Sequence, residues 1–232
     1  MGSAYTWLAM KDASADEACE ALGLVRCGGT FDFPETEYSG AALPKGWYVV
    51  VVNTNEFEYF MNFGLGKLSG LHDLVVVEVF ETIMSFRLAY WRGGARLWEV
   101  IHKGHDGVYH LDAEGELPAD FDSLRLEQVA KQDAEGGEDA EVDCLSEVPL
   151  ELARRITGFG YNLRYDAGEE PIFEELAVSD DADETSGSEE PDSREASYEQ
   201  PPRARPQPRP AQGPPPSGGL VRRLRRWLGG GS

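Results

Sequence analysis

The chain has 232 residues, of which 41% are hydrophobic, so it is long enough and apolar enough to bury a sizeable core. Its 42 acidic and 21 basic residues give a formal net charge of −21 at pH 7. This excess of negative charge disfavours direct binding to nucleic acid and favours a basic protein as partner.

The first 45 residues predict a strand, a short helix and a loop. Residues 5–10 form an apolar run of strand length. Ser14 and Glu17 have the spacing of a capping box and Gly23 is a typical helix stop, so a helix is expected between them. Residues 24–45 are rich in Gly, Pro and Thr and are therefore predicted to form a loop.

The middle of the chain predicts most of the sheet. The uninterrupted apolar run at residues 47–52 is typical of a central strand that is buried on both faces. Apolar residues at nearly helical spacing predict a second helix over residues 57–68. Four further runs predict an antiparallel meander, at residues 74–82, 85–91, 96–102 and 108–112. Gly93 and Gly94 favour a type I′ turn between the second and third of these runs.

Two more helices are predicted after the meander. One begins near Pro118 and ends at Gly136, and the other opens with Pro149 and ends at Gly158. The order of elements contains no regular βαβ repeat. We therefore expect an α+β fold of two layers, with a mainly antiparallel sheet of about six strands and with helices mostly on one face.

The composition changes after residue 173. Residues 174–200 contain eleven acidic residues and one arginine with few apolar side chains, so this acidic segment is predicted to be disordered. Residues 201–219 are rich in Pro and Arg and predict an extended linker. We expect one acidic globular domain at residues 1–173, followed by a long disordered C-terminal tail that ends in a Gly-rich terminus at residues 229–232.

Residues 220–228, between the linker and the Gly-rich terminus, predict a short basic amphipathic helix. Its apolar side is Leu220, Val221, Leu224, Trp227 and Leu228, and its basic side is Arg222, Arg223, Arg225 and Arg226. Nine helical residues span only about 13 Å, which is too short to cross a bilayer, and a helix this short is marginal in water. We therefore expect it to dock on the chain's own acidic domain, on an anionic membrane or in a groove of a partner protein.

Charge and cysteine content bear on location. Residues 201–232 contain seven arginines and no acidic residue, so subtracting +7 from −21 leaves −28 on residues 1–200. The N-terminus lacks the features of a secretory signal, and three cysteines at irregular spacings argue against a disulfide framework. These features predict a cytoplasmic protein, which its tail can recruit to the inner membrane surface or to a protein assembly.

Three of the four histidines lie close together in the sequence. They are His102, His105 and His110, with Asp106 and Asp112 nearby. Side chains on a strand alternate between its two faces, so this spacing does not encode convergence on one metal ion. We predict no metal site, no cofactor and no assigned catalytic residue.

Two other features carry hypotheses about sites. Cys27 is a candidate reactive thiol, because Arg26 favours its thiolate and the glycines after it give access, whereas Cys19 is expected to be a buried helical thiol. Tyr90 and Trp91 point to opposite faces of a strand, so an aromatic groove is expected if one face of the sheet lacks helices.

Three stretches of the domain, GWYVVVV, RLWEV and EVPLELARRITGF, resemble members of an uncharacterised bacterial family of small acidic α+β proteins. The resemblance covers about residues 4–165. It implies a bacterial cytoplasmic protein and carries over no activity and no functional residue.

The sequence favours a non-enzymatic bacterial interaction protein, of the immunity or inhibitor type, whose acidic domain binds a basic partner and whose tail ends in a docking peptide. One alternative is an enzyme of unknown class with a site near Cys27 or near His102 and His110. Another is an adaptor or cargo protein that its tail recruits to a membrane or a protein assembly.

Overall fold

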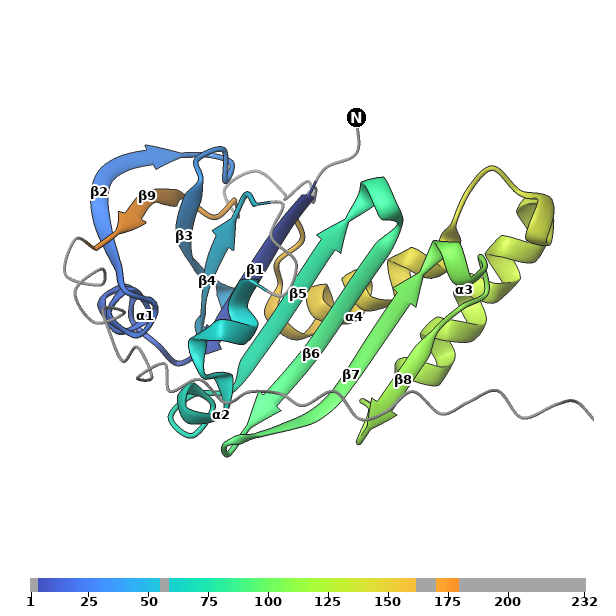
Figure 1. The fold of residues 1–232 in the computed structure, drawn as a ribbon, viewed down its shortest axis with the longest axis horizontal. Coiled ribbons are helices and arrows are strands. Elements are labelled where there is room, and N and C mark those ends of the chain that lie inside the picture. Colours follow the sequence, from blue (N-terminus) through green and yellow to red (C-terminus); the bar gives the residue numbers. More distant parts are fainter. Residues whose placement is uncertain (1–3, 55–58, 162–169, 180–232) are drawn as a thin grey trace, which may run out of the picture. The chain divides into compact units, whose positions relative to one another are not determined.

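The computed structural model describes residues 4–54, 59–161 and 170–179, which form one antiparallel sheet with helices packed against it (Figure 1). In this part of the chain the sheet has nine strands in the order β2-β9-β3-β4-β1-β5-β6-β7-β8. The strands are β1 (Ala4–Lys11), β2 (Leu24–Phe31), β3 (Tyr38–Leu43), β4 (Trp47–Val52), β5 (Leu74–Phe80), β6 (Ser85–Arg92), β7 (Ala95–Lys103), β8 (Asp112–Gly115) and β9 (Phe173–Val178). The α-helices are α1 (Ala15–Leu22), α2 (Leu65–Leu68), α3 (Phe121–Glu135) and α4 (Glu147–Thr157). The α+β class and the antiparallel pairing are therefore confirmed.

Elements that depend on local sequence form as predicted. The Ser14 hydroxyl accepts a hydrogen bond from the Glu17 amide at 3.2 Å, and the Glu17 carboxylate accepts one from the Ser14 amide at 2.8 Å. This capping box starts α1, and Gly23 ends it with a φ of 65°. Between β6 and β7, Gly93 and Gly94 have φ values of 60° and 87°, as a type I′ turn requires.

The predicted loop at residues 24–45 is wrong, because it contains β2 and β3. β2 is an edge strand with mostly exposed side chains and a register shift after Arg26. β3 consists largely of small residues, and at Gly40 an added Cβ would lie 2.3 Å from the hydroxyl oxygen of Tyr48. Neither strand has the apolar alternation that a sequence pattern detects, so the sheet has nine strands rather than about six.

Two other predicted elements are corrected. Within the described residues, the helix expected at 57–68 is a 3₁₀ turn at Tyr59–Phe63 followed by α2, and Gly64 separates the two with a φ of 61°. The strand expected at 108–112 is wrong, because those residues follow the 3₁₀ turn Gly104–Asp106 and β8 begins only where the predicted range ends. Glycines and polar turn residues interrupt both patterns.

β9 lies beyond the predicted end of the domain at residue 173. It is inserted between β2 and β3, and Leu176 pairs with a residue of each neighbour. Glu174 on β9 forms an ion pair with Arg26 on β2, so a residue of the predicted acidic segment belongs to the sheet. The domain therefore includes all of β9, whereas the predictions for residues 180–232 lie outside the described residues.

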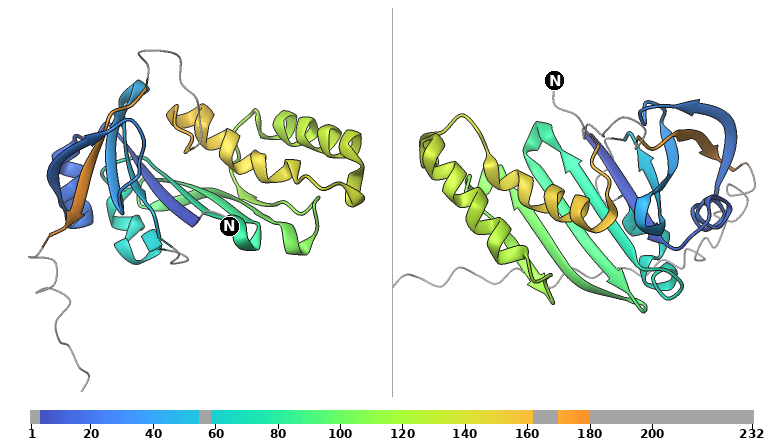
Figure 2. Two further views of the ribbon diagram at one scale, coloured as in Figure 1. Left: turned by 90° about the horizontal axis from the view of Figure 1, so that it is seen from above. Right: turned by 180° about the vertical axis from the view of Figure 1, so that it is seen from behind.

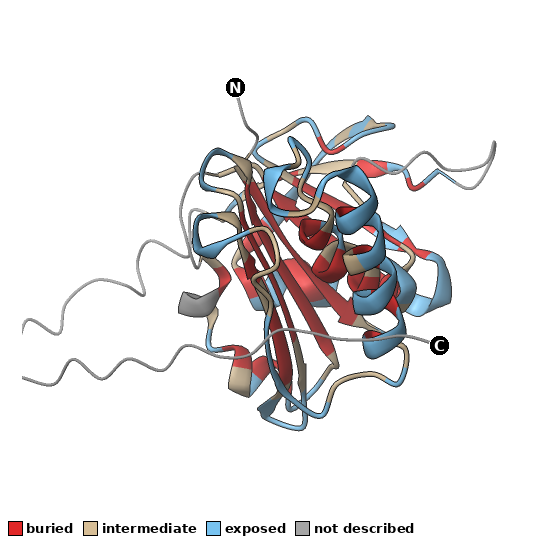
Figure 3. Ribbon diagram, turned by 90° about the vertical axis from the view of Figure 1, so that its right-hand side faces the viewer, coloured by how far each residue is buried: buried red, intermediate tan, exposed pale blue. Residues whose placement is uncertain are grey.

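Each face of the sheet carries a hydrophobic core, and Figure 3 shows the central strands of the sheet as buried. The longer helices α3 and α4 cover the face that includes Trp7, Val77 and Leu88. The shorter helices α1 and α2 cover part of the other face, around Leu8 and Tyr48, and no described helix lies over that face at β6–β8 (Figure 2). None of the described helices is long and apolar enough to span a membrane.

Candidate binding cleft

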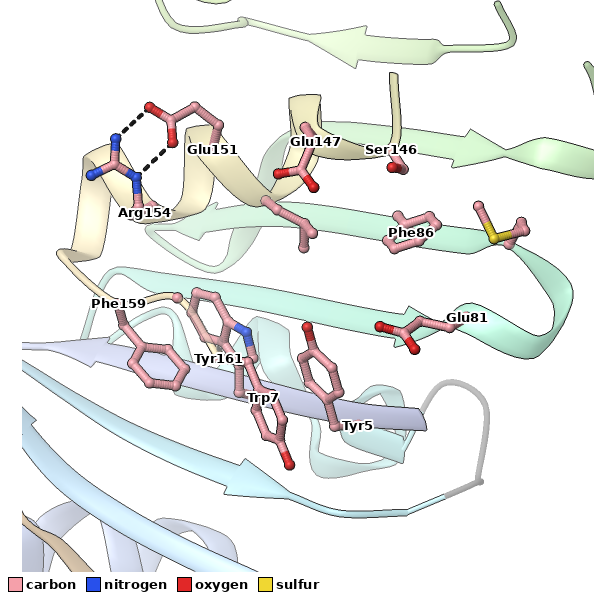
Figure 4. A pocket seen from close by; sticks show the side chains of 13 residues that line it. Tyr5, Trp7, Glu81, Phe86, Ser146, Glu147, Glu151, Arg154, Phe159 and Tyr161 are labelled. Carbon is pink, nitrogen blue, oxygen red and sulfur yellow. Dashed lines mark hydrogen bonds and ion pairs between the residues drawn. The ribbon is translucent and has the colours of Figure 1, made fainter. Parts of the chain in front are cut away.

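A cleft of about 600 Å³ lies between α4 and the strands β1, β5 and β6 (Figure 4). Side chains from α4, from the sheet and from the segment after α4 line it. Its floor is aromatic and its walls carry carboxylates, so it combines apolar and charged surface in one concave site.

The floor is formed by alternate residues of β1 and by the segment after α4. Tyr5 and Trp7 point to the same face because they are two residues apart on a strand. The ring of Tyr161 stacks on that of Tyr5 with centroids 3.8 Å apart, and Phe159 meets Trp7 edge-on at 5.2 Å. The Tyr161 hydroxyl donates a hydrogen bond to the side-chain oxygen of Asn53 at 2.8 Å. These contacts hold the floor in one arrangement.

The walls carry three carboxylates. Glu147 and Glu151 are four residues apart on α4 and lie on the same side of the helix. Glu81 comes from the 3₁₀ turn that follows β5. Arg154 donates hydrogen bonds to both oxygens of Glu151, each at 2.6 Å. Three carboxylates and one guanidinium thus give the lining residues a formal charge of −2.

Burial and neighbouring charges shift the pKa values of three groups in the cleft, Glu147, Tyr5 and Glu151. The pKa of Glu147 is raised, first because the cleft partly desolvates its carboxyl group and second because of the charge of Glu151. Burial raises the pKa of the Tyr5 hydroxyl well above its ordinary value, and the charges of Glu81, Tyr161 and Glu147 raise it further. Hydrogen bonds from Arg154 lower the pKa of Glu151, so this carboxylate stays ionised and the guanidinium balances its charge. The carboxylates beside the floor are therefore the part of the cleft that attracts a positive charge.

A second groove of about 460 Å³ extends the acidic surface between α3 and α4. It shares Glu147 and Glu151 with the cleft and adds Glu127. Its basic groups are already engaged, since Lys131 pairs with Glu127 at 2.8 Å and Arg155 pairs with Glu151 at 2.9 Å. A partner protein can therefore contact the cleft and the groove together.

The residues that line the cleft do not include Cys27, His102 or His110. Its lining contains no cysteine or histidine, and its serine, Ser146, donates its hydroxyl to the backbone oxygen of Asp143 at 2.6 Å. The described lining residues therefore do not pair a nucleophile with a base. The lining combines aromatic rings with carboxylates, and both kinds of group attract cations.

The histidines of the metal hypothesis have other contacts. His102 on β7 is completely buried, with Nε2 2.8 Å from an oxygen of Asp143 and Nδ1 2.7 Å from the backbone oxygen of His110. His110 accepts a hydrogen bond from the Lys103 amide through Nδ1 at 2.9 Å. In the described part of the chain, no group of three or more His, Cys, Asp or Glu residues is placed to hold a metal ion. The ring of His102 instead connects β7 to two loops.

The candidate thiol lies far from these histidines in the sheet. Cys27 is exposed on the edge strand β2, and six strands separate β2 from β7, which carries His102. Cys19 is buried in α1, as expected. The structure thus does not bring Cys27, His102 and His110 into one site.

Two site predictions remain, the aromatic groove at Tyr90 and Trp91 and the docking peptide of the tail. Tyr90 stacks on Trp98 at 5.5 Å and Trp91 packs against the core of the opposite face, so packing accounts for these aromatic rings. The docking residues of the tail lie outside the described residues; they are Leu220, Val221, Arg222, Arg223, Leu224, Arg225, Arg226, Trp227 and Leu228.

The sequence alone does not predict the cleft, because segments far apart in the chain build it. The alternation of Tyr5 and Trp7 and the four-residue spacing of Glu147 and Glu151 are both visible in the sequence. What brings them together is the packing of α4 across the sheet, which no local pattern encodes.

Comparison of the chain with protein-family models, with curated proteins and with solved structures finds no match. The resemblance to an uncharacterised bacterial family therefore stays a prediction. The structure thus defines an α+β protein that has a cleft with an aromatic floor and carboxylates in its walls.

Proposed function

We propose that the protein is a non-enzymatic interaction module, of the immunity or inhibitor type, whose acidic domain binds a basic protein partner. The observation that carries this proposal is the cleft, where three carboxylates and one guanidinium surround an aromatic floor. Aromatic side chains anchor protein interfaces, and carboxylates at their edge select a basic partner.

The charge distribution supports the same conclusion. Residues 1–200 have a net charge of −28, which speeds the encounter with a basic protein and slows it with an acidic one. The neighbouring groove enlarges the acidic surface next to the cleft. Steering by the charge of residues 1–200 and anchoring in the cleft are therefore directed at the same class of partner.

Photo-crosslinking identifies the partner. A benzoylphenylalanine at Ile83, which is 54% exposed in the turn next to Glu81, is expected to capture a basic protein in the lysate of the source organism. The same group at Leu126, which is 60% exposed on α3, serves as the control position. A captured protein that is acidic, or that crosslinks equally from both positions, contradicts the proposal.

A charge-matched pair of variants then tests the cleft. Glu81→Gln with Glu147→Gln removes two charges from the walls and is expected to weaken binding of the captured protein at least about tenfold. Glu116→Gln with Glu141→Gln removes two charges from exposed positions outside the cleft and is expected to have a small effect. Equal losses of affinity in the two double variants would show that the cleft is not the contact.

We propose separately that residues 220–228 form a docking peptide, on the basis of their amphipathic pattern. Deleting residues 218–232 is expected to abolish recruitment to a protein assembly or to anionic vesicles and to leave the unfolding temperature unchanged. Co-sedimentation with phosphatidylserine vesicles distinguishes a membrane from a protein target. Unchanged localisation in cells after the deletion contradicts this second proposal.

A further inference from the structure

Tyr5 is a buried residue whose hydroxyl opens into the cleft. The side chain is 4% exposed, and Figure 4 shows its hydroxyl directed into the cleft. No described residue forms a hydrogen bond with it. The floor therefore offers a hydroxyl that can donate and accept a hydrogen bond to a ligand in the cleft.

Acceptors from three different elements surround the same space. Tyr5 lies on β1, Glu81 follows β5 and Glu147 lies on α4, and all three line the cleft (Figure 4). After burial, the charges of Glu81 and Glu147 are among the causes that raise the pKa of the Tyr5 hydroxyl. A positively charged group with several donors can contact these acceptors together.

Apolar side chains occupy the surface between the acceptors. Trp7, Phe86 and Leu150 are the main ones, and the first two are 2% and 5% exposed. A ligand that reaches the Tyr5 hydroxyl must therefore lie against aromatic and aliphatic surface. In the described residues this acceptor set is not one of the groups that could hold a metal ion.

A guanidinium fits these requirements better than an ammonium. It carries five donors in a plane, is weakly hydrated and stacks on aromatic rings, whereas an ammonium is a compact and strongly hydrated charge. The rim of the cleft already contains such a contact, because Arg154 binds both oxygens of Glu151. We infer that the cleft binds the guanidinium of an arginine side chain of the basic partner, an inference that rests on the proposed function.

Titration with three short peptides tests the ligand class. The full chain is titrated with acetyl-Gly-Arg-Gly-amide, with its lysine counterpart and with its citrulline counterpart, which has nearly the same shape and no charge. The readout is the chemical shift of the indole N–H of Trp7, which lines the cleft. We expect the arginine peptide to bind about tenfold more tightly than the lysine peptide and the citrulline peptide to produce no saturable shift.

Two variants link this binding to the floor. Tyr5→Phe removes this hydroxyl and is expected to weaken binding of the arginine peptide several-fold. Tyr38→Phe is the matched control, because the Tyr38 hydroxyl accepts a hydrogen bond from Tyr59 and lies outside the cleft. A parallel titration uses the full chain with the seven arginines of residues 201–232 replaced by glutamine, so that these arginines do not compete with the peptide.

The outcomes separate this inference from the proposed function. Equal affinity for the arginine and lysine peptides, or no effect of Tyr5→Phe, overturns the arginine inference and leaves the basic-partner proposal in place. The inference is also overturned if no peptide binds to the full chain or to its arginine-to-glutamine variant while Glu81→Gln with Glu147→Gln still weakens binding of the captured partner. If the partner does not depend on these two residues, the proposed function fails independently of the peptides.

Discussion

The hydroxyl of Tyr48 is buried over Gly40 and has no hydrogen-bond partner among the described residues. A buried hydroxyl that lacks a partner lowers the free energy of unfolding. We therefore expect Tyr48→Phe to leave that free energy unchanged or to raise it by up to about 1 kcal/mol. Urea denaturation at pH 7 measures the difference, and a clear loss of stability would show that the hydroxyl has a partner.

Gly40→Ala places a methyl group 2.3 Å from the same oxygen and 2.9 Å from Leu176. We expect it to lower the free energy of unfolding by about 1–3 kcal/mol, as overpacking of a core does. Tyr48→Phe in the same chain is expected to restore part of this loss, because it removes the nearest clashing atom. A double variant no more stable than Gly40→Ala alone would contradict this account of why β3 carries a glycine there.

The raised pKa of Glu147 predicts a conflict between stability and binding at one residue. Because the pKa is raised in the folded state, the contribution of Glu147 to stability is fully present below the pKa of the unfolded chain, about 4.3, and is lost as the pH rises through the folded value. Glutamine does not ionise, so Glu147→Gln is expected to raise the free energy of unfolding slightly at pH 7.5 and not at pH 4.

Urea denaturation at the two pH values checks this prediction, with Glu141→Gln as the control at an exposed position. The same Glu147→Gln protein is expected to bind the basic partner more weakly at pH 7.5, because it lacks the carboxylate. A residue that lowers stability while serving a ligand is typical of a functional site. Lower stability of Glu147→Gln at pH 7.5 would contradict the sign of the effect.

At the scale of elements, a ladder of charges connects four neighbouring strands. Arg87 on β6 binds Glu78 on β5 at 3.2 Å and Glu99 on β7 at 2.6 Å. Arg96 on β7 binds Glu99 at 2.7 Å and reaches Glu114 on β8 at 3.6 Å. The three central groups are nearly buried on a face that no described helix covers at β6–β8. The ladder therefore holds this part of the sheet together through paired charges.

Removing the central guanidinium tests the ladder. Arg87→Leu removes the positive charge beside the buried carboxylates of Glu78 and Glu99. It is expected to lower the free energy of unfolding by about 3–5 kcal/mol. Arg125→Leu, at an exposed position on α3, is expected to change it by less than about 0.5 kcal/mol. Equal stability of the two variants by thermal denaturation would show that the ladder adds nothing to the fold.

β9 makes the end of the domain testable. It pairs with both β2 and β3, so a chain that ends at residue 173 leaves those two strands without their shared neighbour. We expect that chain to lose the cooperative unfolding transition or to unfold at a clearly lower temperature than a chain that ends at residue 179. Circular dichroism during heating distinguishes the two. The same melting temperature for both chains would contradict the inserted position of β9.

These elements also show what the sequence alone can predict. The capping box of Ser14 and Glu17 and the turn at Gly93 and Gly94 depend on neighbouring residues, so short-range rules predict them correctly. β9 depends on pairing with β2, which lies about 150 residues away, and its two adjacent glutamates resemble the acidic segment that follows. The cleft was missed for the same reason, because Tyr5 and Glu147 meet only when α4 packs on the sheet.

At the scale of the whole molecule, the acidic charge and the cleft make separable contributions to binding. Long-range attraction by the −28 of residues 1–200 acts on the association rate and is screened by salt. Contacts in the cleft act mainly on the dissociation rate, because they form only after encounter. Raising the ionic strength is therefore expected to slow association markedly, whereas Glu81→Gln with Glu147→Gln is expected mainly to speed dissociation.

The most direct measurement is the map of amide and indole chemical-shift changes when the full chain is titrated with the captured basic protein. The account predicts that the largest changes cluster around the aromatic floor and the acidic walls, at Tyr5, Trp7, Glu81, Glu147 and Tyr161. Changes confined to the opposite face, around α1 and α2, would contradict it.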